Sequence, residues 1–528
     1  MVNRSGSILL FILLALVSTG VASITVYPKP DQEPDSADYQ VWVRSAAHPS
    51  APLTPVPVYG SFQFDLGSGQ KLRGRPVSPV SFCSVDANEP IEITVRLESG
   101  LADAGIDTSR VIVRPLALQL HPVVSSGELH LRVEKQPCQV TIEPGGQIRH
   151  PLHLFINPPE EHPPDSAAPD VLYFGPGYHE ITGVKLLDGQ TLYLAGGAVL
   201  ELQPIPPDQR SGPTEQLYGL PAFRGPALVD ARDRKRITIR GRGLLSCHKA
   251  LEAGQRSDVV DLGGCQNLAL EGVVLREPGH AGVHVVNGSD VLIDNLKVFC
   301  PYINGDGIII GGTSRVLVRN CFTHNADDSL EVKIWREQHD VEFRDCIVWN
   351  DLGGSLGLMS ESDADSSDIR FRNCTVIHCT DNQSASPVIG LKLDGRGSAS
   401  RYLFENIVVE EVTGPRRPAL KVFNNWVGWG LGPGNAESPY EMAAPLPSDT
   451  VRGSISQVTF KNIQILHAAN PDVVLMAAGA SAPIHGVSFD NVVINGRLLE
   501  AGDSRLKANT WVADVRVAPP HPSTGFGR

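Results

Sequence analysis

Three aspartates stand in two short polar segments that lie about one repeat unit apart in the chain. Asp306 belongs to the segment NGDG at residues 304–307, and Asp327 and Asp328 belong to NADDS at residues 325–329. Carboxyl groups held close together raise one another's pKa, so one can stay protonated as an acid while another is ionised as a base. Such a set suits cleavage of a glycosidic bond. In the alternative interpretation, the aspartates only cap turns or bind calcium.

The segments that would position these aspartates recur along the C-terminal two thirds of the chain. Each has apolar residues at alternate positions and ends in Asn, Asp or Gly. They are 237–241 (ITIRG), 268–272 (LALEG), 291–295 (VLIDN), 316–320 (VLVRN), 341–345 (VEFRD), 369–373 (IRFRN), 402–406 (YLFEN), 458–462 (VTFKN) and 487–491 (VSFDN). Successive end residues are 23 to 33 residues apart, except for one gap of 56 residues after Asn406, which we interpret as two coils with an insertion.

This repeat predicts an all-β fold, a right-handed, single-stranded parallel β-helix. A unit of this length can bury its inward side chains only against its neighbours, and the alternation excludes a leucine-rich horseshoe with a helix in each unit. Asn and Asp suit the corner because they tolerate the left-handed conformation. Asp306 and Asp327, 21 residues apart, should lie one above the other at about the 4.8 Å strand spacing. Cys321, Cys346 and Cys374 each follow a corner and should stack inside as a buried ladder.

The chain divides into five predicted segments. Residues 1–23 have the layout of a signal peptide, with an apolar run at 8–17, which predicts a secreted protein, extracellular or periplasmic. Short alternating strands at 24–157 predict a small N-terminal β-sandwich that precedes the helix. A proline-rich and acidic linker at 158–169 separates it from the catalytic β-helix at 170–512, and residues 513–528 form a C-terminal tail.

Composition narrows the class of partner. The net charge is -13 and no Lys/Arg cluster is present, which argues against nucleic acid or an anionic membrane surface as partner. Nine cysteines are too few for a disulfide scaffold, and none has zinc-like spacing with histidine, so we predict no metal and no cofactor. We expect a monomer that binds a polysaccharide or oligosaccharide.

Parts of the chain resemble glycoside hydrolase family 49, the dextranase and isopullulanase family, and more distantly family 28, the polygalacturonases, within the pectin-lyase-like β-helix superfamily. The matching stretches are 106–118, 172–178, 192–198, 270–278, 306–310 and 325–330. The resemblance implies that Asp327 is the general acid and that Asp306 and Asp328 activate water. Hydrolysis would then invert the anomeric configuration.

The chain departs from these families next to the aspartates. Where family 28 has Gly-His-Gly, this chain has 353–355 (GGS), and where it has Arg-x-Lys, this chain has Lys392 and Asp394 around a leucine. Asp394 should repel a uronate, so a neutral, α-glucan-like polysaccharide is favoured over pectin. The residues before Asp306 also differ from the family 49 pattern. A polygalacturonase-like pectin hydrolase, a non-catalytic carbohydrate-binding β-helix and a polysaccharide lyase are the alternatives.

Several side chains are candidates for substrate contact. Trp426 and Trp429 lie in the 56-residue gap, where they could stack on sugar rings or simply pack the insertion onto the helix. Trp335 and Trp349, nearer the aspartates, allow the same two interpretations. Lys333 shares a strand face with Glu331 and could reach substrate, although a solvated lysine is the favoured alternative at this position. Lys392 could also reach substrate.

Overall fold

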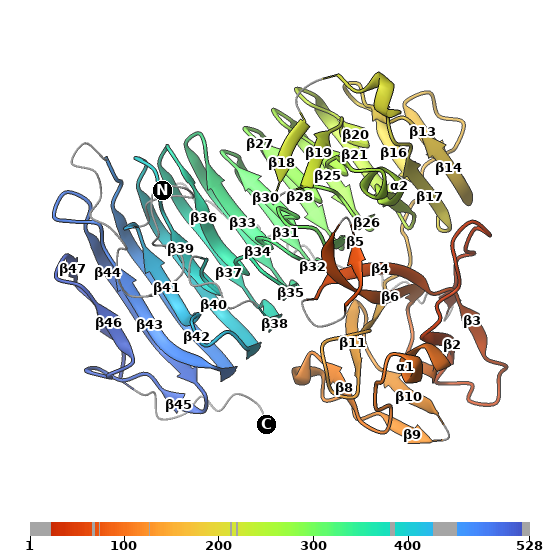
Figure 1. Ribbon diagram of the computed structural model, residues 1–528, viewed down its shortest axis with the longest axis horizontal. Helices are drawn as coiled ribbons and strands as arrows, with labels where there is room; N and C mark the ends of the chain where they lie inside the picture. The colour runs from red at the N-terminus through yellow and green to blue at the C-terminus, as the bar shows by residue number, and fades with distance from the viewer. Residues whose placement is uncertain are drawn as a thin grey trace, which may run out of the picture.

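A computed structural model describes residues 23–65, 69–72, 74–125, 127–211, 214–217, 220–380, 386–425 and 451–519. Figure 1 shows two parts side by side, an N-terminal pair of sheets and a long stack of coils. The predicted signal peptide lies outside the described residues apart from Ser23, and so do Trp426, Trp429 and the last nine residues of the predicted tail. None of the helices in the described ranges is long and apolar enough to cross a membrane.

The N-terminal part consists of two sheets whose facing side chains form one apolar core. The seven-stranded sheet contains β1 (Ile24–Thr25), β6 (Arg75–Ala87), β12 (Leu152–Asn157), β11 (Cys138–Pro144) and β8 (Val111–Arg114), with β4 (Tyr59–Phe64) and β5 (Lys71–Leu72) paired to β6. The five-stranded sheet contains β3 (Thr54–Val56), β2 (Tyr39–Ser45), β7 (Ile91–Leu97), β10 (Glu128–Val133) and β9 (Val123–Ser125). Most pairings are antiparallel, with β6 and β12 parallel. A short helix, α1 (Ser99–Asp103), follows β7.

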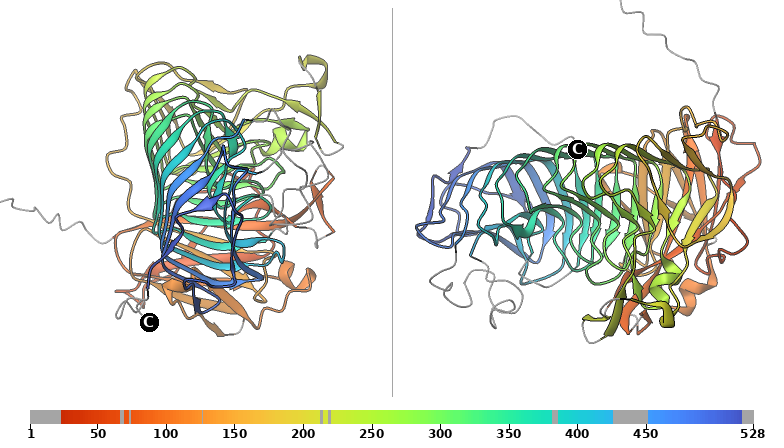
Figure 2. Two further views of the ribbon diagram at one scale, coloured as in Figure 1. Left: turned by 90° about the vertical axis from the view of Figure 1, so that its left-hand side faces the viewer. Right: turned by 90° about the horizontal axis from the view of Figure 1, so that it is seen from above.

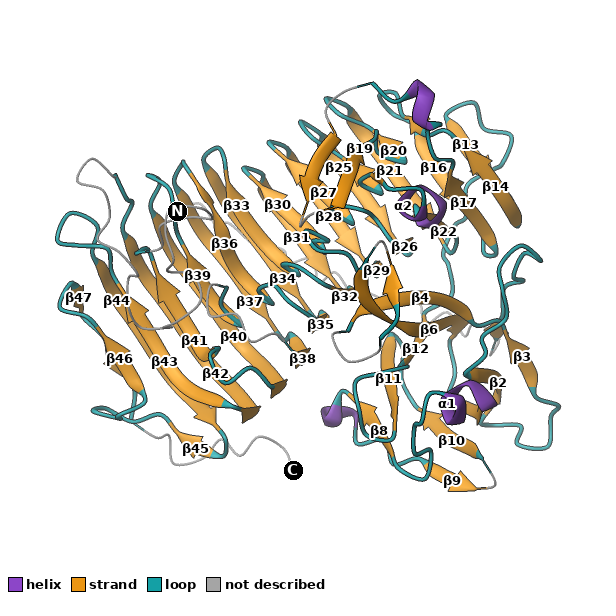
Figure 3. Ribbon diagram, in the orientation of Figure 1, coloured by secondary structure: helices purple, strands orange, loops and turns teal. Residues whose placement is uncertain are grey.

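The coils build two parallel sheets, and the predicted all-β, right-handed β-helix is confirmed. One sheet has eleven strands: β15 (Val184–Lys185), β20 (Val229–Asp230), β24 (Val260–Asp261), β27 (Val283–Val286), β30 (Ile308–Gly311), β33 (Leu330–Ile334), β36 (Leu356–Ser362), β39 (Ile389–Lys392), β41 (Pro418–Phe423), β43 (Asn470–Met476) and β46 (Leu506–Ala508). Figure 2 shows the coils stacked one behind another, and Figure 3 shows that strands dominate every coil.

The second sheet has 22 strands, because most coils contribute two strands to it. They are β13 (Val171–Phe174), β14 (Gly177–Ile181), β16 (Thr191–Leu194), β17 (Ala198–Leu202), β21 (Lys235–Gly241), β22 (Leu244–Ser246), β25 (Gln266–Glu271), β26 (Val274–Arg276), β28 (Ser289–Asp294), β29 (Lys297–Cys300), β31 (Ser314–Arg319), β32 (Phe322–Asn325), β34 (Gln338–Arg344), β35 (Ile347–Asn350), β37 (Ser366–Arg372), β38 (Thr375–Cys379), β40 (Ala399–Val412), β42 (Ile455–Ala468), β44 (Ile484–Ile494), β45 (Arg497–Leu498), β47 (Val512–Ala513) and β48 (Arg516–Val517). A third, three-stranded sheet of β18 (Thr214–Leu217), β19 (Leu220–Arg224) and β23 (Gln255–Arg256) stands beside a short helix, α2 (His248–Glu252).

The strand pairing corrects one prediction about the repeat. Strands β40 and β42 pair directly, with Tyr402 opposite Val458, and β41 pairs with β43. The 56-residue gap is therefore one coil with an insertion, and the interpretation as two coils is wrong. The excess length lies in the connection from β41 to β42 and adds no rung to either sheet. Strands β47 and β48 also pair with β44, so the sheet continues past residue 512.

One corner of each coil carries the left-handed residue that the repeat predicted. Asn295, Asn320 and Asp345 have φ between 54° and 57°, and the corners at 373, 406, 462 and 491 are similar. Their side chains bond from coil to coil: Asn406 donates to Asn373 at 3.1 Å, and Asn462 donates to Asn406 at 2.9 Å.

Two ladders of identical side chains fill the interior behind this corner. Cys321, Cys346 and Cys374 are buried and unpaired by disulfides, which confirms the predicted cysteine ladder. Beside it five phenylalanines stack with ring centroids 4.7 to 5.3 Å apart: Phe343, Phe371, Phe404, Phe460 and Phe489. Parallel pairing without register shifts is what stacks like on like.

The N-terminal part packs on the outer face of the 22-stranded sheet. Phe82 of β6 stacks on Phe299 of β29, with ring centroids 4.5 Å apart, within an apolar cluster shared by the two parts. Trp349 is fully buried here, with rings of His324 and His378 against it and its Nε1 donating to Asp351 at 3.0 Å. Its role is therefore in packing the two parts together.

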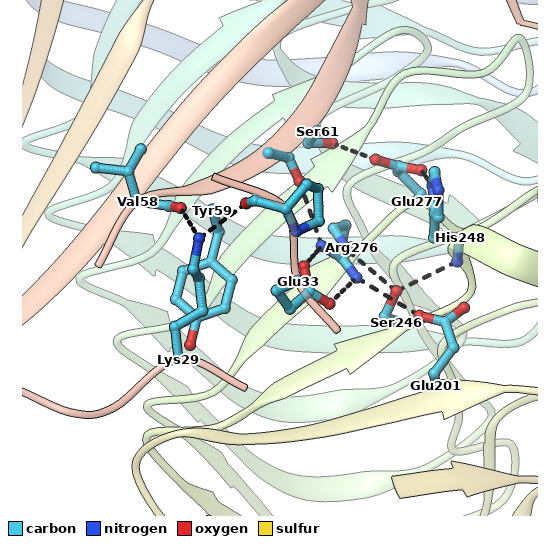
Figure 4. Close-up of polar contacts among 12 residues, drawn as sticks. Lys29, Glu33, Val58, Tyr59, Ser61, Glu201, Ser246, His248, Arg276 and Glu277 are labelled. Atoms are coloured by element: carbon cyan, nitrogen blue, oxygen red, sulfur yellow. Dashed lines mark hydrogen bonds and ion pairs between the residues drawn. The ribbon is translucent and has the colours of Figure 1, made fainter. Parts of the chain in front are cut away.

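A buried ion pair joins the two parts in the same interface (Figure 4). Arg276 of β26 donates from both terminal nitrogens to the carboxylate of Glu33, at 2.7 and 2.8 Å, and from Nε to Ser246 at 3.0 Å. Glu201 lies 3.5 Å from the same guanidinium. Beside it, Glu277 accepts from Ser61 across the interface at 2.9 Å. Because these charges are out of water, each depends on its partner.

We predict that Arg276→Met costs about 3–5 kcal/mol of unfolding free energy, because it leaves Glu33 and Glu201 buried without a cation. Urea unfolding followed by circular dichroism measures this. The matched control is Arg315→Met, whose partner Asp290 is exposed and which should change stability little. Equal effects of the two substitutions would contradict the assigned role of Arg276.

Candidate active site

The outer face of the eleven-stranded sheet carries the candidate site. On each strand the inward side chains join the core and the outward ones line this face, as with inward Leu330 and Val332 and outward Glu331 and Lys333 on β33. The register places Glu331 between Ile309 of the preceding coil and Gly357 of the next. Polar side chains that look scattered in the sequence therefore form rows across successive coils.

The three aspartates stand where chain segments enter neighbouring strands of this sheet. Asp306 precedes β30, and Asp327 and Asp328 lie between β32 and β33. Ile308 pairs with Leu330, and the Gly307 amide donates to the Asp328 carbonyl at 2.8 Å, so Asp306 lies level with Asp328. The predicted neighbours were Asp306 and Asp327. The register differs by one residue because the paired residues Ile308 and Leu330 are 22 positions apart, one more than Asp306 and Asp327, yet the three carboxylates still come together.

Backbone amides hold two of the carboxylates. Asp327 accepts from the amides of Asn304, at 3.1 Å, and Asp328, at 3.0 Å. Asp328 accepts from the Gly354 amide at 2.5 Å. A Cβ at position 353 would stand 2.2 Å from the backbone carbon of Asp327, so only glycine allows this approach. The segment that replaces Gly-His-Gly thus packs against the aspartate turn.

A pair of buried asparagines shapes the same turn. Asn325 donates to the carbonyls of Asp327, at 2.6 Å, and Asp328, at 3.0 Å. Asn350, paired with Asn325 on the next coil, donates to the Asp327 carbonyl at 2.6 Å and to Gly354 at 3.2 Å. The side-chain amides of these two asparagines therefore supply hydrogen-bond donors to carbonyl groups of a turn that lies outside the regular strands.

Lys333 stands among carboxylates, although a solvated lysine was the alternative for this position. Its Nζ lies 3.5 Å from Asp306, 3.6 Å from Glu331 and 3.1 Å from Glu361. Burial alone would lower the pKa of Lys333, but Glu331 and Asp306 hold it well above its usual value. Lys333 is thus a fixed positive charge within the carboxylate set.

Burial raises the pKa of four carboxyl groups at the site. It raises the pKa of Asp327 to about 6, helped by the charge of Asp306, and that of Asp328 to about 6, helped by Asp327. Burial also raises the pKa of Asp306, against the opposing effect of Lys333. Glu331, fully buried, has a pKa well above its usual value. Some of these groups are therefore protonated near neutral pH.

A second group of cations lies on the C-terminal side of the aspartates. Lys392 of β39 is buried, which lowers its pKa, while Asp328 opposes that shift. Lys421 of β41 is nearby, 3.9 Å from the Phe423 ring centroid, and burial together with Lys392 lowers its pKa to about 7. Asp394 accepts from the amide and hydroxyl of Ser362 at 3.3 and 3.2 Å.

Sequence reasoning missed several polar residues of this face. Glu331 was used only to orient Lys333, and Asp258 and His280 were not considered. His280 Nδ1 lies 2.7 Å from Asp258 Oδ1, and the charge of His280 acts on the pKa of Asp306. The alternation of β33 was a signal for Glu331, whereas Asp258 and His280 lie in the turns before β24 and β27 and follow no alternating pattern. Within the described ranges no group of three or more His, Cys, Asp or Glu side chains is placed to hold a metal ion.

Comparisons with known proteins agree with this architecture. A family described as right-handed beta helix region matches residues 258–412. Dex49A from Penicillium minioluteum has a similar structure over 93% of this chain and 96% of that chain, with a TM-score of 0.60 and 14% identity. The chain has the pectin-lyase-like β-helix fold.

Two curated relatives are plant proteins. A probable polygalacturonase of Arabidopsis thaliana is 25% identical over 165 residues, which are 31% of this chain and 35% of that protein. Polygalacturonase QRT2 of the same plant is 23% identical over 232 residues, 43% of this chain and 47% of that protein. The chain thus matches between about a third and a half of the length of these relatives.

The charge arrangement yields a pH-dependent prediction. Lys333→Met should cost about 3–5 kcal/mol at pH 7.5, because Asp306 and Glu331 lose their cation. A carboxyl group whose pKa is higher in the folded than in the unfolded protein binds its proton more tightly in the folded state. It lowers the free energy of unfolding as pH rises from about 4 through its pKa in the folded protein. The loss should therefore be at least about 1 kcal/mol smaller at pH 5.

Urea unfolding at the two pH values measures this difference. The control is Lys461→Met, whose partner Glu405 lies on the other sheet and is partly exposed, and which should show no such dependence on pH. A pH-independent loss in Lys333→Met would show that the lysine acts through packing of its stem alone.

Proposed function

We propose that the protein is a glycoside hydrolase that cleaves a polysaccharide with inversion of anomeric configuration. The observation that carries the proposal is the meeting of Asp306, Asp327 and Asp328 beside Lys333, with the pKa values of Asp327 and Asp328 raised to about 6. The similarity to two plant polygalacturonases supports the class of reaction. Membership of glycoside hydrolase family 49 stays a prediction, as do secretion and a monomeric state.

The surroundings of the three carboxyl groups support a division of roles. Lys333 lies 3.5 Å from Asp306, and the charge of Lys392 lowers the pKa of Asp328. These two lysines therefore favour the ionised form of Asp306 and Asp328, which is the form that a base requires. Lys333 and Lys392 act on Asp327 and Asp328 alike, and the pKa of each is raised to about 6. The resemblance to family 49 is what assigns the proton donor to Asp327. In the proposed reaction Asp327 protonates the glycosidic oxygen, while Asp306 and Asp328 take a proton from the attacking water.

We predict that Asp327→Asn lowers kcat/KM by about 10²- to 10⁴-fold, because it removes the proton donor and preserves the shape of the side chain. In the wild type, kcat/KM should fall as pH rises above about 6, where the acid deprotonates, and also at low pH, where the base is protonated. The apparent values belong to the coupled set.

A reducing-sugar assay across pH 3 to 8 measures these rates, with dextran, pullulan and polygalacturonate as substrates. Proton NMR of the first product should show inverted configuration. Retention, or wild-type rates in Asp327→Asn, would contradict the mechanism. Release of an ultraviolet-absorbing product indicates a lyase, and binding without any cleavage indicates a carbohydrate-binding protein.

The proposed substrate is a neutral, α-glucan-like polysaccharide, because Asp394 stands where family 28 has the second cation. A specific observation favours a second candidate, an acidic polysaccharide. Asp394 is bonded to Ser362, while Lys421 lies next to Lys392 on the adjacent strand. Two buried lysines on neighbouring coils attract a carboxylate when they are protonated, which for Lys421 is the case below about pH 7.

The two candidates differ in their response to one substitution. For a neutral substrate, the wild type should hydrolyse dextran or pullulan faster than polygalacturonate, and Lys421→Met should change KM by less than about 3-fold. For an acidic substrate, Lys421→Met should raise KM for polygalacturonate about 10-fold or more, since charged hydrogen bonds contribute about 1.5–3 kcal/mol. The control Lys461→Met should leave both values unchanged.

A further inference from the structure

We propose that Trp335, His284 and His280 form a sugar-binding subsite on the N-terminal side of the aspartates, where a pyranose ring of the substrate stacks on the indole. This inference rests on the proposed function and deepens it. The three side chains come from two coils and meet on the outer face of the eleven-stranded sheet, next to Lys333.

Trp335 packs against the outer face of the sheet. It follows β33, and its ring covers Gly311 of the preceding coil, where a Cβ would stand 2.3 Å from the indole. The indole can therefore occupy this position only because residue 311 is a glycine. The ring centroid is 5.9 Å from Lys333 Nζ, and Lys333 is 3.5 Å from Asp306. The ring is partly exposed, so it offers an apolar surface within reach of a sugar placed at the aspartates.

Two imidazoles stand beside this surface. His284 of β27 meets the indole edge to face, with centroids 6.0 Å apart, and the rings of His280 and His284 are 6.1 Å apart. Both side chains keep about a fifth of their surface exposed. Polar groups next to an aromatic ring are what a pyranose requires, because its faces are apolar and its rim carries hydroxyls.

Asp258 fixes the orientation of His280. Its Oδ1 accepts from the Ala281 amide at 3.0 Å and lies 2.7 Å from His280 Nδ1, so that nitrogen carries the proton. His280 Nε2 has no hydrogen-bond partner among the described residues and is left to face a ligand. Asp258 is buried, yet hydrogen bonds from His280 and Ala281 lower its pKa to about 2. It therefore stays ionised at any working pH.

The subsite is suited to an uncharged sugar. Burial lowers the pKa of His284 to about 4, so the ring is neutral above about pH 5 and both donates and accepts hydrogen bonds. Two cations near the subsite each face a carboxylate: Lys333 lies 3.5 Å from Asp306, and Arg224 lies 3.7 Å from Asp258. Lys392 and Lys421, which could hold a uronate, are on the opposite side of the aspartates. Whichever substrate class the C-terminal side takes, the N-terminal side is built for a ring recognised by its hydroxyls and apolar face.

Kinetics of Trp335→Ala test the subsite on whichever of dextran, pullulan or polygalacturonate the wild type hydrolyses. KM should rise about 3- to 10-fold, as expected for loss of one stacking contact, while kcat stays within about 2-fold because the ring binds substrate and transition state alike. Trp335→Phe should restore most of the affinity. Trp511→Ala is the matched control, since Trp511 is exposed and stands next to β47, far along the coil stack.

A double-substitution cycle tests whether the residues share one ligand. His284→Leu should raise KM about 3- to 10-fold, and the effects of Trp335→Ala and His284→Leu should not add when combined. Additive effects, or an unchanged KM in Trp335→Ala, would overturn the subsite and leave the proposed hydrolysis intact. If the wild type hydrolyses none of the three polysaccharides, the proposed function itself fails, and the subsite with it.

Discussion

Parallel hydrogen bonding between successive coils is the constraint on which the rest of the structure depends. Each strand is held level with its counterparts in the coils before and after it, so a residue type that suits one position is repeated at that position along the stack. The left-handed Asn corners, the cysteine ladder and the phenylalanine stack are all consequences of this register. The same register sets Asp306 level with Asp328 and places Glu331 in one row with Gly357.

Charge is distributed unevenly over this scaffold. The chain carries a net charge of -13, yet several cations are buried beside clustered carboxylates. Arg276 is buried between the two parts, and Lys333 and Lys392 stand at the site. Buried pairs of this kind add little net stability, but removing one partner is costly. At the site, burial, reinforced by repulsion between neighbouring carboxylates, is what keeps protons on some of the carboxyl groups near neutral pH. Rigid backbone around the aspartates, with Asn325 and Asn350 bonded to their carbonyls, prevents relaxation of that arrangement.

The fold could be predicted because its signals are local and periodic. The corner residues and Cys321, Cys346 and Cys374 follow from alternation within single segments. The number of coils could not be predicted from the length of the chain alone. The gap after Asn406 has the length of two units, but β40 pairs directly with β42. Trp349 resembled a site residue because nothing in the sequence shows that the N-terminal part covers its strand. Glu331 escaped notice because a polar residue at an outward strand position has the pattern of ordinary surface, and Asp258 and His280 because they lie in turns, where polar residues are common. The roles of the aspartates remain proposals.

The direct pairing of β40 with β42 separates two properties of the coil stack. Tyr402 stays opposite Val458 and Phe404 opposite Phe460, although 56 residues separate the members of each pair along the chain. The number of residues in a coil therefore does not set the register, which is set by the pairing of the strands. The stack is tolerant of length between its strands and strict along them.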